Sequence, residues 1–71
     1  MSQLTHEQYN RLERAVTRSE RIAVSRKGGE LILVPLAMRT HKGREVIDAR
    51  NPTTGDALLI YLDEVDSLES L

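Results

Sequence analysis

This chain contains no cysteine, no phenylalanine and no tryptophan. Without cysteine, neither a disulfide nor a thiolate-bound metal ion is available to stabilise its 71 residues. Its two histidines, His6 and His41, do not by themselves make a zinc site, so we expect no metal and no other cofactor. The aromatic residues are Tyr9 and Tyr61. Leucine, isoleucine and valine must therefore supply the core.

The chain also lacks an excess of one charge sign. Ten Lys and Arg residues oppose eleven Asp and Glu residues, which gives a net charge of −1 at pH 7. This balance excludes a strongly basic arm and a strongly acidic disordered tail. The charges are nevertheless distributed unevenly, because residues 1–44 carry +5 and residues 45–71 carry −6. This uneven distribution of charge could attract a charged partner or pair one subunit head to tail with another. Alternatively, positive and negative side chains interleave on the surface when the chain folds.

No long apolar segment is present. The first ten residues lack the basic and apolar regions of a secretory leader. The longest apolar run, residues 31–38, is interrupted by Pro35 and is too short to cross a bilayer. We therefore expect one cytoplasmic domain over residues 1–71, without a membrane partner, close to the lower size limit for independent folding.

The N-terminal segment predicts a helix over about residues 5–18. Thr5 is a suitable N-cap, and Gln8 three residues later completes a capping box. Apolar side chains then recur at helical spacing at Tyr9, Leu12 and Val16. This face is expected to cover one end of the remaining structure.

From residue 21 onward, short strand-like runs alternate with turn formers. Turns are indicated at residues 27–30, 41–43 and 51–56, and Pro35 indicates an edge or a bulge. The expected strands are residues 21–26, 31–37, 45–50, 57–62 and 65–71. The predicted fold class is mainly β (α+β), with one N-terminal helix followed by a five-stranded antiparallel, strongly bent sheet or small Sm/SH3-like barrel.

Motifs of catalysis are missing as well. The chain has no nucleophile elbow, no glycine-rich phosphate loop and no histidine pair at metal spacing. An acidic cluster occurs at Asp63, Glu64 and Asp66, but neighbours along a strand point to opposite faces and do not converge. We therefore predict no catalytic residue and no enzymatic activity.

Basic residues gather in and next to the predicted turns. They are Arg26, Lys27, Arg39, Lys42 and Arg44. If these turns lie at one end of a barrel, the five cations could bind the phosphates of a nucleic acid or an anionic small molecule. No Phe or Trp is nearby to stack on bases, which disfavours single-strand binding. Alternatively, the turns are basic simply because they are solvated.

Five short motifs follow one another in a characteristic order. They are Leu-Glu-Arg-Ala-Val at 12–16, Pro-Leu-Ala-Met at 35–38, Gly-Arg-Glu-Val-Ile at 43–47, Asn-Pro-Thr-Thr-Gly at 51–55 and Ile-Tyr-Leu-Asp-Glu-Val at 60–65. In this order, residues 12–68 resemble a WYL domain, the Sm-like sensory module of many bacterial transcription regulators. The resemblance implies a regulatory, ligand-binding or nucleic-acid-binding function.

The chain departs from that family at its binding residues. Glu45 and Val46 occupy the places of the signature Trp and Tyr, and Leu58 and Glu64 occupy the places of arginines on the last strands. The resemblance therefore implies the fold more than the site. The helix-turn-helix that usually precedes a WYL domain is not in this sequence, so we expect a sensory module alone or a fragment of a longer protein.

Two segments carry a second, shorter resemblance. Residues 9–15 and 61–65 are similar to segments of small bacterial antitermination proteins that bind the Rho factor, which also place a helix before an Sm-like barrel. Those proteins engage their partner through an acidic surface. This implies an alternative function, a protein-interaction module that acts through Asp63, Glu64 and Asp66 or through a strand edge, or that forms a homo-oligomer.

Overall fold

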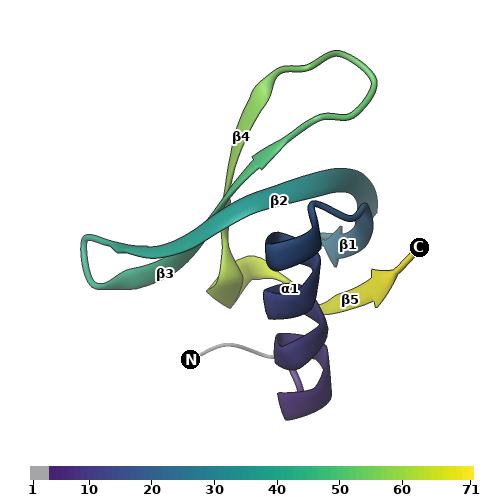
Figure 1. Ribbon diagram of the computed structural model, residues 1–71. Coiled ribbons are helices and arrows are strands. Elements are labelled where there is room, and N and C mark those ends of the chain that lie inside the picture. The colour runs from purple at the N-terminus through teal and green to yellow at the C-terminus, as the bar shows by residue number, and fades with distance from the viewer. Residues whose placement is uncertain (1–3) are drawn as a thin grey trace.

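A computed structural model describes residues 4–71, in which one helix precedes five antiparallel strands (Figure 1). The elements are α1 (His6–Arg18), β1 (Ile22–Arg26), β2 (Gly29–His41), β3 (Arg44–Arg50), β4 (Ala57–Tyr61), the 3-10 turn η1 (Leu62–Glu64) and β5 (Ser67–Ser70). The predicted mainly β (α+β) class and element order are confirmed. Residues 1–3 lie outside the described residues, although the predicted domain includes them and the prediction about a secretory leader partly rests on them.

The strands form one sheet in the order β4-β3-β2-β1-β5. The central strand β2 is shared, because residues 29–33 pair with β1 and its remaining length pairs with β3. Near the start of the β3-paired part, the register shifts between Pro35 and Ala37, which places a bulge in the middle of β2. The sequence prediction of an edge or a bulge at Pro35 is therefore resolved as a bulge.

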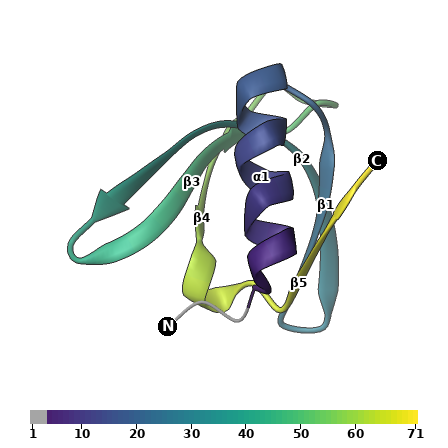
Figure 2. The same ribbon diagram turned by 60° about the horizontal axis from the view of Figure 1, so that its bottom comes forward.

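The sheet is strongly bent around α1 but does not close (Figure 2). Within the described residues, β4 and β5 are its two edges, and η1 connects them along the chain. The bent-sheet form of the predicted fold is the one observed. A closed barrel would have removed both edges.

Two strand predictions need correction. β2 runs from Gly29 to His41, well beyond the expected residues 31–37, because both of its hairpins turn within two residues and the ladder continues up to each turn. The last strand is shorter than expected. Residues 62–64 form η1, so β4 ends at Tyr61, and the last strand pairs with β1 only from Ser67 to Ser70 instead of over residues 65–71.

The β1–β2 and β2–β3 turns each consist of a Lys-Gly pair in the left-handed region of backbone space. The φ angles are 49° and 76° at Lys27 and Gly28, and 53° and 77° at Lys42 and Gly43. Positive φ at both central residues is what a type I′ turn requires, and its usual residues are Asn, Asp and Gly. Each hairpin therefore has a lysine at its tip in a conformation that lysine rarely adopts.

The helix begins and ends as the sequence predicts. The Gln8 amide donates to Thr5 Oγ1 at 3.1 Å, and the Thr5 amide donates to Gln8 Oε1 at 3.0 Å, which completes the capping box. At the other end, Ser19 adopts a left-handed conformation with φ of 55°. Both caps fix the length of α1 independently of the sheet.

The core consists of aliphatic side chains, as the composition requires. Its largest fully buried members include Leu12, Ile22, Leu33, Ile47, Ile60, Leu62 and Leu68. Tyr9 and Val16 of α1 pack against this cluster as partly buried neighbours, which confirms the predicted helix face. Among residues 4–71, no polar or charged residue is buried, and no helix has the length and apolar character needed to span a bilayer.

A hydrogen bond joins the helix to β3. The Tyr9 hydroxyl donates to Glu45 Oε2 at 2.6 Å. This bond, together with burial and the negative charge of Glu45, raises the pKa of Tyr9 to about 12. The hydrogen bond therefore stabilises the fold fully below the ordinary tyrosine pKa, and this contribution is lost as the pH rises toward 12.

This contact predicts the alkaline titration of Tyr9. In a Tyr61→Phe variant, Tyr9 is the remaining tyrosine, and we expect its phenolate absorbance to rise with a midpoint near 12 rather than 10.0. Adding Glu45→Gln should move the midpoint back toward 10.0, because the accepting carboxylate is gone. Circular dichroism in the same titration reports the folded state. A midpoint near 10.0 in the folded Tyr61→Phe protein would contradict the hydrogen bond.

Candidate functional site

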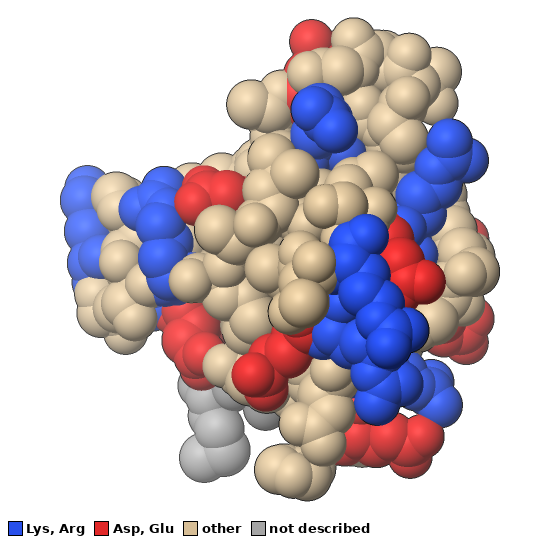
Figure 3. All heavy atoms as spheres, viewed as in Figure 1, with Lys and Arg blue, Asp and Glu red and all other residues tan. Residues whose placement is uncertain are grey.

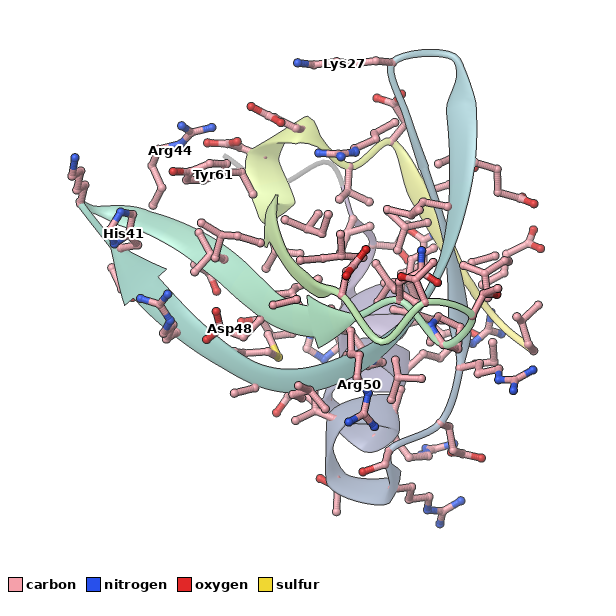
Figure 4. The ribbon with its side chains drawn as sticks, turned by 90° about the horizontal axis from the view of Figure 1, so that it is seen from above. Lys27, His41, Arg44, Asp48, Arg50 and Tyr61 are labelled. Atoms are coloured by element: carbon pink, nitrogen blue, oxygen red, sulfur yellow. The ribbon has the colours of Figure 1, made fainter. Side chains whose placement is uncertain are left out.

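Two hairpins meet at η1 and bring charged side chains together. The β1–β2 hairpin contributes Arg26 and Lys27, β3 contributes Arg44, and η1 itself contributes Asp63 and Glu64. We call these five residues the η1 cluster. Figure 4 shows Lys27 at the tip of the β1–β2 hairpin and Arg44 on β3. All five side chains retain solvent exposure, from 30% at Glu64 to 76% at Lys27.

Arg44 is the most firmly held member of the η1 cluster. Its Nε and Nη2 donate to the two carboxylate oxygens of Asp63 at 2.8 and 2.6 Å, the paired geometry in which arginine binds carboxylates most strongly. Its guanidinium also lies over the ring of Tyr61, 3.8 Å from the centroid (Figure 4). The hydrogen bond from Arg44 is the main cause that lowers the pKa of Asp63, and it raises the pKa of Arg44.

Glu64 has a different kind of contact with the cations. Its Oε2 lies 3.4 Å from Arg44 Nη2, and its Oε1 lies 3.7 Å from Arg26 Nη1 and 4.0 Å from Lys27 Nζ. Charge-assisted N–H···O bonds are usually about 2.7–2.9 Å long. Glu64 therefore lies within 4.0 Å of three cations, without a short hydrogen bond to any of them.

The other two predicted cations lie elsewhere. Arg39 donates to both carboxylate oxygens of Asp48, at 2.6 and 3.2 Å, and this bond is the main cause that lowers the pKa of Asp48. Lys42 is at the tip of the β2–β3 hairpin and forms no ion pair with any described residue. Three of the five predicted cations thus converge, while Arg39 and Lys42 do not join them.

The sequence predicts the basic and the acidic residues as two separate candidate sites, but in the structure most of them lie in one cluster. Asp63 and Glu64 lie within the group of cations, whereas Asp66 forms no ion pair with the described residues, and its backbone N–H donates to the Ser25 carbonyl at 2.8 Å. On the face seen in Figure 3, acidic and basic side chains adjoin one another. The two charge signs interleave on folding, which was one of the two explanations left open.

Sequence reasoning missed Tyr61. The expectation that no stacking residue lies near the cations is wrong, because it considered Phe and Trp alone. Tyr61 pairs with Val46 across the β3–β4 ladder, and Arg44 precedes Val46 by two residues on the same face of β3. Arg39 pairs with Val46 from the other side. The register of three strands therefore puts Tyr61 beside Arg44, with Val46 between the ring and Arg39.

The chemistry available to the η1 cluster is binding. Guanidinium and ammonium groups donate hydrogen bonds to an anion, and carboxylates accept them from a cationic partner. Among residues 4–71, no group of three or more His, Asp or Glu side chains is arranged to hold a metal ion.

No family model matches the chain, and no curated protein matches it either.

The Arg44–Asp63 pair predicts an acid titration. We expect the folded-state pKa of Asp63 to lie below 3.8 and to return toward 3.8 in an Arg44→Gln variant, as measured by carboxyl carbon NMR. Because this pKa is lowered by folding, the pair stabilises the fold above the ordinary pKa, and this contribution is lost as the pH falls through the folded-state pKa. Arg18→Gln on α1 removes the same charge and is the control. An unchanged Asp63 titration in Arg44→Gln would contradict the pairing.

Proposed function

We propose that this chain is a non-enzymatic regulatory module that binds the phosphate groups of a nucleic acid or an anionic small ligand at the η1 cluster. The observation that carries the proposal is the convergence of Arg26, Lys27 and Arg44 from two hairpins on one position. The three cations outnumber the two carboxylates Asp63 and Glu64. The WYL-like motif order supports a role in bacterial transcription regulation.

The hairpin turns support the same proposal. Lys27 and Lys42 occupy positions at which Asn would be more stable, because Asn tolerates positive φ better than Lys. A residue in an unfavourable backbone conformation is a reason to ask what its side chain does. At both tips the side chain is a cation, which is consistent with contacts to phosphate. Lys42 would then be a second contact point on the β2–β3 hairpin.

The size of the site limits the expected affinity. Each phosphate contact to a single strand contributes roughly 0.7 to the slope of log affinity against log salt concentration. Three contacts therefore predict a loss of about 20-fold in affinity between 50 and 200 mM salt. Tyr61 adds little base stacking, because the Arg44 guanidinium covers one face of its ring.

Oligonucleotide binding across a salt series tests this function. For a short single-stranded oligonucleotide, measured by fluorescence anisotropy, we expect the stated salt dependence in the unmodified protein. Lys27→Asn should lower the slope by roughly 0.7 and, by relieving the turn, raise the free energy of unfolding by roughly 0.5–1 kcal/mol.

The control for this experiment is Arg18→Gln, which removes one positive charge on the exposed surface of α1. It should leave the slope unchanged. The function is rejected if the protein does not bind at low salt, if affinity is independent of salt, or if Lys27→Asn and Arg18→Gln bind alike.

A second function is favoured by the edges of the sheet. In the part of the chain that the structure describes, β4 and β5 each present one unpaired strand edge, and Leu59 on β4 is 40% exposed. Such an edge can pair with a strand of another chain. The alternative is thus a protein-interaction module, either as a homo-oligomer or docked on a transcription factor such as Rho through Asp63, Glu64 and Asp66.

Light scattering over a concentration series and a binding assay with purified Rho test this alternative. It predicts a mass that increases with concentration, or binding to Rho that is lost in a variant with both Asp63→Lys and Glu64→Lys. A variant with both Glu13→Lys and Glu20→Lys is the control, since it makes the same change in charge at exposed positions outside the η1 cluster and outside β4 and β5. A protein that stays monomeric, and whose binding to Rho does not respond to the double reversal, rules it out.

A further inference from the structure

Glu64 is the one member of the η1 cluster that lies within 4.0 Å of all three of its cations. Cations from β1, from the β1–β2 turn and from β3 surround its carboxylate, and both of its oxygens face them. Arg44 directs its two short hydrogen bonds to Asp63 and not to Glu64. The carboxylate of Glu64 therefore lies near three positive charges, and its contacts with Arg26 and Lys27 are too long to be strong hydrogen bonds.

A phosphate group fits this position better than a carboxylate does. A carboxylate has two oxygens in one plane, whereas a phosphate is tetrahedral and presents oxygens in several directions at once. Arg26 and Lys27 lie 3.7 and 4.0 Å from Oε1 of Glu64, and Arg44 lies 3.4 Å from Oε2. A larger, tetrahedral anion at the same place could approach Arg26, Lys27 and Arg44 at the short distances typical of charge-assisted bonds.

We propose that Glu64 is an internal occupant of the phosphate site, and that ligand binding displaces its carboxylate into solvent. The inference rests on the proposed function and adds the regulation of that same site. Asp63 has the complementary role, since its paired hydrogen bonds position Arg44 whether Glu64 is in place or displaced. The phosphate could belong to a nucleic acid backbone or to a free phosphate compound, and the two share this chemistry.

Displacement is structurally easy. Glu64 is the last residue of η1, its side chain is 30% exposed, and rotation of that side chain alone moves the carboxylate outward. The contacts that it gives up are the long ones described above, and solvent screens contacts of this kind. Glu64 therefore acts as a competitor that lowers affinity for phosphate without blocking access to the site.

A matched pair of variants tests the inference. Glu64→Gln keeps the shape of the side chain and removes its charge, and Glu69→Gln makes the same change in net charge on β5. The probes are a single-stranded oligonucleotide of twelve nucleotides and inorganic pyrophosphate. We expect Glu64→Gln to bind at least one probe roughly three- to tenfold more tightly than the unmodified protein. Glu69→Gln should change affinity less than about twofold.

The two probes identify the source of the phosphate. If Glu64→Gln binds the oligonucleotide more tightly than the unmodified protein does, the site is assigned to a nucleic acid backbone. If only the affinity for pyrophosphate increases, the site is assigned to a free phosphate compound. If the unmodified protein binds but Glu64→Gln and Glu69→Gln bind alike, the inference is wrong and the proposed function stands. If no form of the protein binds either probe, the proposed function itself fails.

A measurement on the unmodified protein removes any dependence on the variant's folding. On saturation with the probe, the carboxyl carbon signal of Glu64 should shift toward that of a solvated glutamate, while the signal of Glu69 stays unchanged. A Glu64 signal that does not move when the probe binds would overturn the displacement.

Discussion

The sharing of β2 between two partners is the constraint on which the rest of the molecule depends. One thirteen-residue strand pairs with β1 over its first part and with β3 over its second part, and a bulge between Pro35 and Ala37 interrupts it near the start of the second part. The bend of the sheet lets both of its halves contribute side chains to one aliphatic core under α1. It also brings the two hairpins toward η1, so the charged cluster is a consequence of the same bend that forms the core.

The surface of this protein is organised by pairing of charges rather than by their separation. Cations of the first 44 residues meet carboxylates of the last 27, as in the Arg44–Asp63 and Arg39–Asp48 pairs. Exposed pairs of this kind contribute little to stability. They decide which charges remain available to a partner. The η1 cluster has three cations and two carboxylates, so one positive charge is not balanced within it. Glu64 lies near all three cations but forms no short hydrogen bond with any of them.

Much of the fold could be predicted because its signals are local. The capping box at Thr5 and the two Lys-Gly turns each depend on a few consecutive residues, so element order and type follow from the sequence. The extent of β2 and the site depend on register, which is set by contacts between distant residues. The neighbourhood of Arg44 and Tyr61 required knowing which residues of β3 and β4 are opposite each other. The choice between a bent sheet and a closed barrel, the position of Asp63 and Glu64 among the cations and the aromatic ring beside Arg44 all depend on such non-local contacts.

The open sheet has a consequence for the handling of this protein in solution. The edge strand β4 reads Ala-Leu-Leu-Ile-Tyr, a short segment without charge or proline, and such segments are prone to cross-β aggregation when exposed. Acidic residues flank it closely, with Asp56 directly before it and Asp63 two residues after it. Charges in these positions act as gatekeepers against strand stacking. Asp63 therefore serves both the ion pair with Arg44 and the colloidal stability of the native state, and neutralising it in acid weakens both at once.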